Sequence, residues 1–111
     1  MAERITLQQY DNGIKLLLTI RKDGVIEPLT NAKILIKFKN KKDNYEFDRY
    51  ATVTDENNAE CEYVFTEEDL SHPGSYVTEV ETTYGNGVVI SEYNPFIVVI
   101  QEERHNRTEK V

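Results

Sequence analysis

The sequence predicts an all-β fold, an antiparallel β-sandwich of six to eight short strands with one short helical turn near residues 66–71. Apolar and polar side chains alternate along most of the chain, which is the period of a strand with one buried face. Turn-forming pairs of Asn, Asp, Gly and Pro separate these segments at short intervals. Short strands with almost no helical periodicity favour two antiparallel sheets packed face to face.

Two strands are predicted on either side of an Asn-Gly turn at 12–13. Ile5 and Leu7 indicate a short strand before this turn. Apolar residues at every second position of segment 14–21 indicate a half-buried strand after it. An Asp-Gly pair at 23–24 ends that strand.

Segment 32–39 has the clearest strand pattern of the chain. Its apolar, inward positions are Ile34, Ile36 and Phe38, and its outward positions carry Lys33, Lys37 and Lys39. After a polar turn at 40–44, segment 45–53 alternates again, although Arg49 falls on the apolar phase. Residues 55–58 then indicate a hairpin loop, followed by a strand from Cys61 to Phe65.

The second half of the chain is expected to contain the helical turn and the last strands. Thr66 is the N-cap candidate of the turn over 66–71, because Asp69 follows it by three residues. Segment 76–83 alternates, and a hairpin turn at 84–87 follows it. We expect Asn94-Pro95 to interrupt the final ladder before residues 96–100 complete it.

The segment from Leu70 to Tyr76 has the form of a tyrosine corner, in which a tyrosine at the start of a late strand donates its hydroxyl to the upstream turn. Its residues are Leu70, Pro73, Gly74 and Tyr76. Such a corner favours an immunoglobulin-like topology; the alternative is that Tyr76 is an ordinary core aromatic. The lack of Trp and of a cysteine pair excludes an antibody-type domain. We therefore expect a single immunoglobulin-like β-sandwich at residues 1–101 and a polar C-terminal tail at residues 102–111.

The charges are unevenly distributed along the chain. The net charge is −7, but segment 21–42 carries +5 and segment 43–83 carries −11. One interpretation is that neighbouring strands pair opposite charges across their outer faces. The other is that the chain associates with copies of itself as a homo-oligomer, or with a charged partner. The overall negative charge disfavours nucleic acid as a partner.

No apolar run approaches the about twenty residues of a membrane span, so no membrane partner is expected. The first residues lack the apolar core of a signal peptide, which indicates synthesis in the cytoplasm without one.

Residues with catalytic or metal-binding chemistry are few. Cys61 is the single cysteine and falls in phase with Tyr63 and Phe65, which indicates a buried thiol. Neither His72 nor His105 has a companion at metal-ligand spacing. The chain contains no nucleotide-binding or nucleophile motif. The sequence therefore predicts no enzyme activity, no catalytic residue, no metal and no cofactor.

Tyrosines are the main candidates for surface contacts, since the chain has seven of them. Tyr10, Tyr50, Tyr84 and Tyr93 do not fall on the inward phase of a predicted strand. Exposed tyrosines anchor protein contacts and also stack on sugars. Tyr84 and Tyr93 are therefore candidate interface residues; packing at an edge or turn is the alternative for each.

Several landmarks follow one another in a characteristic order. They are the strand 12–18, the segment Pro28-Leu29-Thr30-Asn31-Ala32, the strand end Tyr63-Val64-Phe65 and the segment Pro73-Gly74-Ser75-Tyr76. This order resembles the N-terminal immunoglobulin-like domain of the upper baseplate proteins of tailed phages and prophages of Gram-positive hosts, over about residues 10–101. The resemblance implies a non-enzymatic structural protein of the virion tail, with other tail or baseplate proteins as partners.

We therefore expect an assembly module that docks through a sheet face or an edge strand. The stripe formed by Lys33, Lys37 and Lys39 is a candidate surface for an acidic partner. The alternative function is a carbohydrate-binding or adhesive β-sandwich module at a cell surface, using tyrosines and loop carboxylates.

Overall fold

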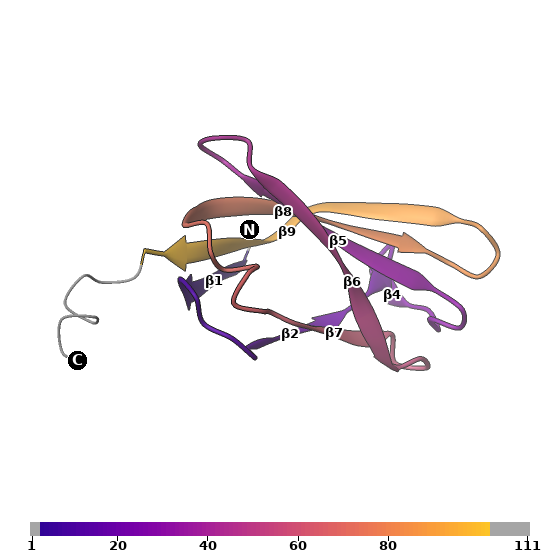
Figure 1. Ribbon diagram of the computed structural model, residues 1–111. Coiled ribbons are helices and arrows are strands. Elements are labelled where there is room, and N and C mark those ends of the chain that lie inside the picture. The colour runs from indigo at the N-terminus through magenta and orange to yellow at the C-terminus, as the bar shows by residue number, and fades with distance from the viewer. Residues whose placement is uncertain (1–2, 103–111) are drawn as a thin grey trace.

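The computed structural model describes residues 3–102, which form nine β-strands and no helix (Figure 1). The strands are β1 (Glu3–Gln8), β2 (Lys15–Thr19), β3 (Arg21–Lys22), β4 (Val25–Ile26), β5 (Lys33–Asn40), β6 (Glu46–Asp55), β7 (Glu60–Val64), β8 (Gly74–Thr83) and β9 (Val89–Gln101). The prediction of an all-β chain is confirmed. Apart from Glu102, the predicted polar tail lies outside the described residues, and so does His105.

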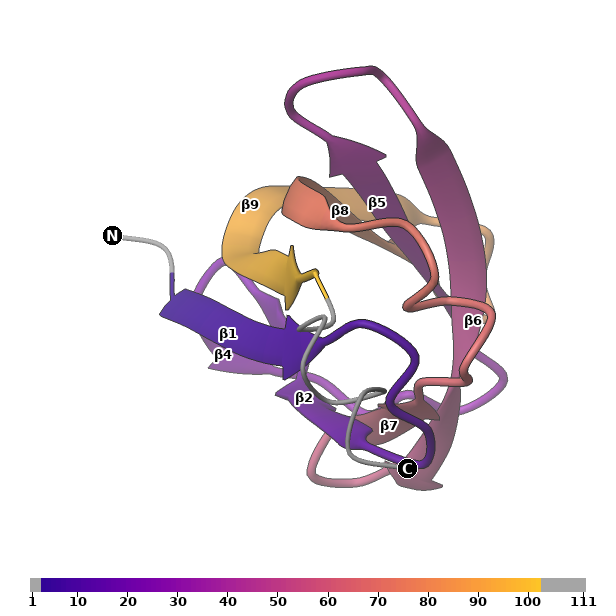
Figure 2. The ribbon, with the colours of Figure 1, turned by 60° about the vertical axis from the view of Figure 1, so that its left-hand side comes forward.

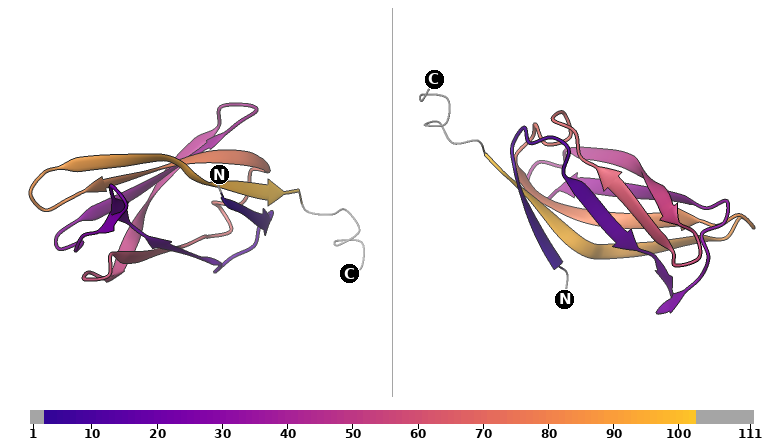
Figure 3. Two further views of the ribbon diagram at one scale, coloured as in Figure 1. Left: turned by 180° about the vertical axis from the view of Figure 1, so that it is seen from behind. Right: turned by 90° about the horizontal axis from the view of Figure 1, so that it is seen from below.

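Seven of the strands form one continuous sheet in the order β1-β9-β8-β5-β6-β7-β2, and β3 and β4 form a separate small hairpin. Strand β6 joins the two halves of the sheet, because its first part pairs with β5 and its last part pairs with β7. The sheet curls strongly, so that its two end strands, β1 and β2, lie on the same side of the molecule (Figure 2 and Figure 3). The fold is therefore a curled half-barrel.

Two parts of the predicted fold class are corrected by this topology. The sheet is mixed, because β1 pairs with β9 in parallel. It is also one curled sheet, without the two separate sheets of a clear immunoglobulin sandwich. The physical reason is that the ten residues of β6 keep their hydrogen-bonding partners on both sides of the bend, so the ladder passes from one layer to the other.

The concave face of the sheet holds the core. In β5, Ile34, Ile36 and Phe38 are buried, as the alternation predicts. Other strands and loops contribute the remaining fully buried apolar side chains, which include Leu29, Cys61, Phe65, Leu70, Tyr76, Val98 and Ile100. Apolar residues from both halves of the sheet thus form one contiguous cluster.

Strand β9 continues through Asn94-Pro95, where the sequence predicts an interruption. The register between β8 and β9 shifts at this point, since Val77 pairs with Ile97 whereas Glu79 pairs with Tyr93. Asn94 has a φ of 55°, in the left-handed region that asparagine tolerates. The extra residues form a bulge, which accommodates a proline without an N–H inside a strand.

The segment 66–71 is a hydrogen-bonded turn and not a helix, which corrects the predicted helical turn. The reciprocal capping contacts are nevertheless present. The backbone N–H of Thr66 donates to Asp69 Oδ2 at 3.0 Å, and that of Asp69 donates to Thr66 Oγ1 at 3.2 Å. Pro73 and the start of β8 at Gly74 leave no room for a second helical turn.

Candidate docking surfaces

The convex side of β5, β6, β8 and β9 is called here the outer face. It carries Lys33, Leu35, Lys37, Lys39, Asp48, Tyr50, Val77, Glu79, Glu81 and Tyr93, which are half-buried or exposed. The three lysines of the predicted stripe project from β5, the strand at the centre of the sheet order.

Lys37 is surrounded by acidic side chains on this face. Its Nζ lies 3.5 Å from Glu81 Oε2 and 3.7 Å from Glu79 Oε2. Asp48 is its register partner on β6. The carboxylate of Glu79 is the main cause that raises the pKa of Lys37, and Glu81 adds to it. Lys37 therefore belongs to a cross-strand charge cluster, which confirms opposite-charge pairing on the outer face.

Lys33 and Lys39 are both exposed, but their surroundings differ. Lys39 is paired in register with Glu46 on β6, whereas Lys33 lies opposite Thr83 on β8. The three lysines thus do not form a continuous, unopposed basic stripe.

Two exposed tyrosines flank the charge cluster on the outer face. Tyr93 on β9 is 70% exposed and is the register partner of Glu79. Tyr50 on β6 is 64% exposed and pairs with Leu35, the neighbour of Glu81. Large aromatic side chains held on rigid strands are suited to anchor a partner protein.

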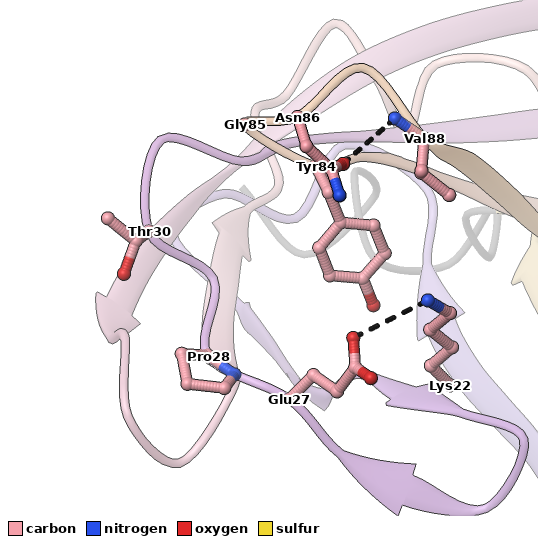
Figure 4. A pocket seen from close by; sticks show the side chains of 8 residues that line it. All are labelled: Lys22, Glu27, Pro28, Thr30, Tyr84, Gly85, Asn86 and Val88. Carbon is pink, nitrogen blue, oxygen red and sulfur yellow. Dashed lines mark hydrogen bonds and ion pairs between the residues drawn. The ribbon is translucent and has the colours of Figure 1, made fainter.

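Tyr84 lies in the tip between β8 and β9 and is only 9% exposed, which corrects its prediction as an exposed contact residue. A cavity of about 420 Å³ is present here, lined by this tip and the segment 27–30 (Figure 4). The Tyr84 ring points toward Lys22 and Glu27, whose charged groups are 3.7 Å apart. Lys22 Nζ is 5.8 Å from the ring centroid. The tip backbone is exposed, but its aromatic ring packs inward.

The turn before β8 is held by Tyr76 and Asn40. The buried Tyr76 hydroxyl donates to the carbonyl of His72 at 2.6 Å, the kind of contact that a tyrosine corner makes. Asn40 Nδ2 donates to the carbonyl of Pro73 at 3.2 Å. Leu70 is fully buried, and Gly74 has a φ of 139° and begins β8. These contacts make the predicted corner a structural support.

Asp69 has a wider structural role than the capping contact that the sequence indicated. Its buried carboxylate accepts from Arg49 Nε at 2.8 Å, from the Thr66 N–H and from the Tyr63 hydroxyl. Arg49, which disturbs the alternation of its strand, reaches across to the 66–71 turn. The capping pair Thr66 and Asp69 and the pattern break at Arg49 were the sequence signals of this cluster, but neither indicated that Arg49 contacts Asp69.

Catalytic chemistry finds little support in the described residues. Burial raises the pKa of the Cys61 thiol to about 11, so the reactive thiolate is disfavoured. His72 Nε2 lies 2.7 Å from Asp43 Oδ2 on the surface. Residues 3–102 contain no group of three or more side chains suited to hold a metal ion. They include no helix that is long and apolar enough to cross a membrane.

The fold and these surfaces define a small all-β domain with a curled open sheet and aromatic side chains exposed on its outer face. Residues 1–107 match the BppU N-terminal domain family, and the chain belongs to this family. The family is that of the baseplate upper protein of phages, a structural family and not an enzyme family. Membership implies a location in the virion tail. No curated protein matches the chain.

Proposed function

We propose that this chain is a non-enzymatic assembly module of a phage or prophage tail baseplate. The observation that carries the proposal is the match of residues 1–107 to the BppU N-terminal domain family. The partners are then other baseplate proteins, as the family suggests. The domain acts by presenting a rigid strand surface to them.

The outer face is the docking surface that the geometry favours. Tyr50 and Tyr93 expose aromatic area there, and the aliphatic side chains of Leu35 and Val77 lie between the same strands. The charge cluster around Lys37 adds directional polar groups beside these anchors. A central apolar anchor with polar neighbours is the usual organisation of a protein interface.

Particle composition tests the function. Phage particles purified after prophage induction are analysed by mass spectrometry, and the chain is located by antibody labelling in the electron microscope. Peptides from the chain and labelling at the tail tip are expected. Absence from particles, with abundant protein in the cell, contradicts the proposal, and saturable binding on a glycan array then favours the carbohydrate-binding alternative.

Variants of the outer face test the docking surface. The double variant Tyr50→Ser/Tyr93→Ser is expected to lose incorporation into particles while keeping its unfolding temperature. Tyr10→Ser is the matched control, because Tyr10 is exposed but lies outside the outer face.

A second double variant, Lys33→Glu/Lys39→Glu, tests the contribution of the basic residues to docking. Lys37 is left unchanged, because its reversal would place a fourth acid among Asp48, Glu79 and Glu81. Normal incorporation of both double variants would exclude this face.

A further inference from the structure

Strand β2 is an edge strand with free backbone groups. It ends the sheet order, and among residues 3–102 its strand partner is β7 alone. The β2–β7 ladder continues beyond both ends of the strand through bonds from Phe65 N to Ile14 O and from Ile20 N to Ala59 O, each 2.8 Å. Because an antiparallel ladder alternates, Leu16 and Leu18 direct their N–H and C=O groups to β7. The corresponding groups of Lys15, Leu17 and Thr19 therefore face the free edge.

The side chains of this edge are apolar at its centre on both faces. Leu17 is 70% exposed on one face. Leu16 and Leu18 lie on the other face, and all three leucines line a groove of about 310 Å³ together with Ile5 of β1, Phe65 and Phe96. An exposed edge strand with three consecutive leucines is a template for pairing with another strand.

We propose that two copies of this chain pair antiparallel along β2, about a two-fold axis at Leu17; the inference rests on the proposed assembly role. In this register Leu17 lies opposite Leu17 of the second copy, and Lys15 lies opposite Thr19. Residues 15, 17 and 19 are those whose backbone groups face the free edge, so each of the three residue pairs can exchange two hydrogen bonds. On the inner face, Leu16 meets Leu18 of the second copy.

This register is the one that best matches the side chains. A shift by two residues would place Lys15 against Leu17 of the second copy and leave one end of each strand unpaired. A shift by one residue would bring the inner-face side chains of one copy beside the exposed side chains of the other copy. The sequence of β2 is nearly symmetric about Leu17, with leucines at 16 and 18 and polar residues at 15 and 19. An isologous interface requires such self-complementarity.

Charge complementarity supports the same arrangement. Glu60 is the register partner of Thr19 on β7, so it lies in the cross-strand row of Lys15 of the second copy. The two Cα atoms would be about 10 Å apart, twice the spacing of neighbouring strands. Only the short Thr19 side chain lies between them. Among residues 3–102, neither Lys15 nor Glu60 has an ion-pair partner within its own chain.

The test is the mass of the full chain in solution, measured by sedimentation equilibrium over a range of concentrations. A mass about twice the 12.9 kDa of one chain is expected at the highest concentrations. Leu17→Pro is expected to abolish the dimer, because it removes an N–H of the free edge and a central side chain. Proline is tolerated at such positions, where the N–H has no partner in the sheet. Tyr93→Ser is the matched control, since Tyr93 is equally exposed but lies on β9, and it should stay dimeric.

A charge swap tests the register even if Leu17→Pro fails to fold. Lys15→Glu and Glu60→Lys should each weaken the dimer about tenfold, and the combined variant should restore it. A single-chain mass at every concentration, a dimer that persists in folded Leu17→Pro, or a combined swap that restores nothing would overturn the proposal.

Particle incorporation separates this inference from the proposed function. A chain that enters particles but is monomeric refutes pairing along β2 and leaves the baseplate role standing. A dimer that depends on Leu17 but is absent from particles supports pairing and refutes the baseplate role.

Discussion

Asp69 connects the turn at 66–71 to two strands through a carboxylate that is almost inaccessible to solvent. Arg49 reaches it from β6 and Tyr63 from β7, and the Thr66 N–H comes from the turn itself. Burial is the main cause that raises the pKa of Tyr63 to about 12, and the hydrogen bond to Asp69 adds to it. Tyr63 thus remains a neutral donor at any physiological pH.

Replacement of this carboxylate should be costly. Asp69→Ala is expected to lower the free energy of unfolding by about 3 kcal/mol, because it leaves the half-buried guanidinium of Arg49 and the half-buried hydroxyl of Tyr63 without their acceptor. Tyr63→Phe removes one donor only and should cost about 1 kcal/mol. Urea denaturation measures both values. Equal losses for the two variants would contradict the central place of Asp69.

The hydroxyl of Tyr76 is the second single group with a defined role. Tyr76→Phe keeps the buried ring and removes the bond to the His72 carbonyl, so the free energy of unfolding should fall by about 1 kcal/mol. Tyr45→Phe is the control, because Tyr45 is exposed and stacks on His72 through its ring. If the two variants have equal stability in urea denaturation, the corner bond contributes nothing.

At the scale of elements, Gly74 and Asn40 join the start of β8 to the end of β5. A Cβ on Gly74 would lie 2.3 Å from Asn40 Nδ2, and the φ of 139° disfavours any other residue. Asn40 is buried and binds both the Pro73 carbonyl and the Lys42 N–H. Displacement of its side chain would therefore break both contacts.

Gly74→Ala should consequently lower the free energy of unfolding by about 3 kcal/mol, from backbone strain and from the lost Asn40 contacts. Gly87→Ala is the matched control, since its φ is 88° but nothing lies within 4 Å of the added Cβ. It should cost about 1 kcal/mol. Chemical denaturation compares the two, and an equal cost would show that Asn40 adjusts freely.

The hairpin between β5 and β6 is tied to the turn before β8 by Asp43 and His72. The hydrogen bond with His72 is the largest cause that lowers the pKa of Asp43 below its ordinary value of 3.8, and the Tyr45 N–H is the next. A carboxyl whose pKa is lower in the folded state contributes stability above its ordinary pKa, and this contribution is lost as the pH falls through the folded value.

The contribution of the Asp43 carboxylate should therefore keep the difference in unfolding temperature between the wild type and Asp43→Asn constant above pH 3.8. Below pH 3.8 this difference should shrink. Thermal melts followed by circular dichroism across this range measure the effect. Asp55→Asn provides a comparison, because its pKa is lowered by contacts with Asn58 and not by a histidine. A difference that grows in acid would contradict the assignment.

At the scale of the whole molecule, one core and one shared strand make the two halves of the sheet interdependent. The core cluster includes Leu16 of β2 and Val98 of β9, which lie in different halves. Strand β6 pairs with both halves. Global unfolding is therefore expected to be a single cooperative transition.

Leu16→Ala tests this interdependence. It should lower the free energy of unfolding by about 3 kcal/mol through the cavity that it leaves. Hydrogen-exchange protection should fall by the same amount for the most protected amides of β7 and of β8. At protein concentrations at which the chain is monomeric, Leu17→Ala, at the exposed neighbour, should change neither. A loss confined to β2 and β7 would identify them as a separate unfolding unit.

The alternation of residue types determined the strands and their faces without any knowledge of the fold. Ile34, Ile36 and Phe38 point inward, and Tyr76, Thr78 and Val80 do the same, as their spacing predicts. Side chains of a strand alternate between its two faces, so this information is local. The capping contact between Thr66 and Asp69 was also predictable from the sequence, because it too depends on residues that are close together in the chain.

Tertiary structure alone decided which strands became neighbours. The parallel pairing of β1 with β9 joins the two ends of the described chain, and no local pattern encodes it. The same holds for single residues: the folded chain includes Tyr84 in its buried core cluster, and strand order surrounds Lys37 with Glu79, Glu81 and Asp48. The sequence by itself determined an all-β chain and the direction of its side chains, because these depend on residues two positions apart. The curl of the sheet, its two free edges and the partners of each surface residue depend on contacts between distant segments, which only the folded chain brings together.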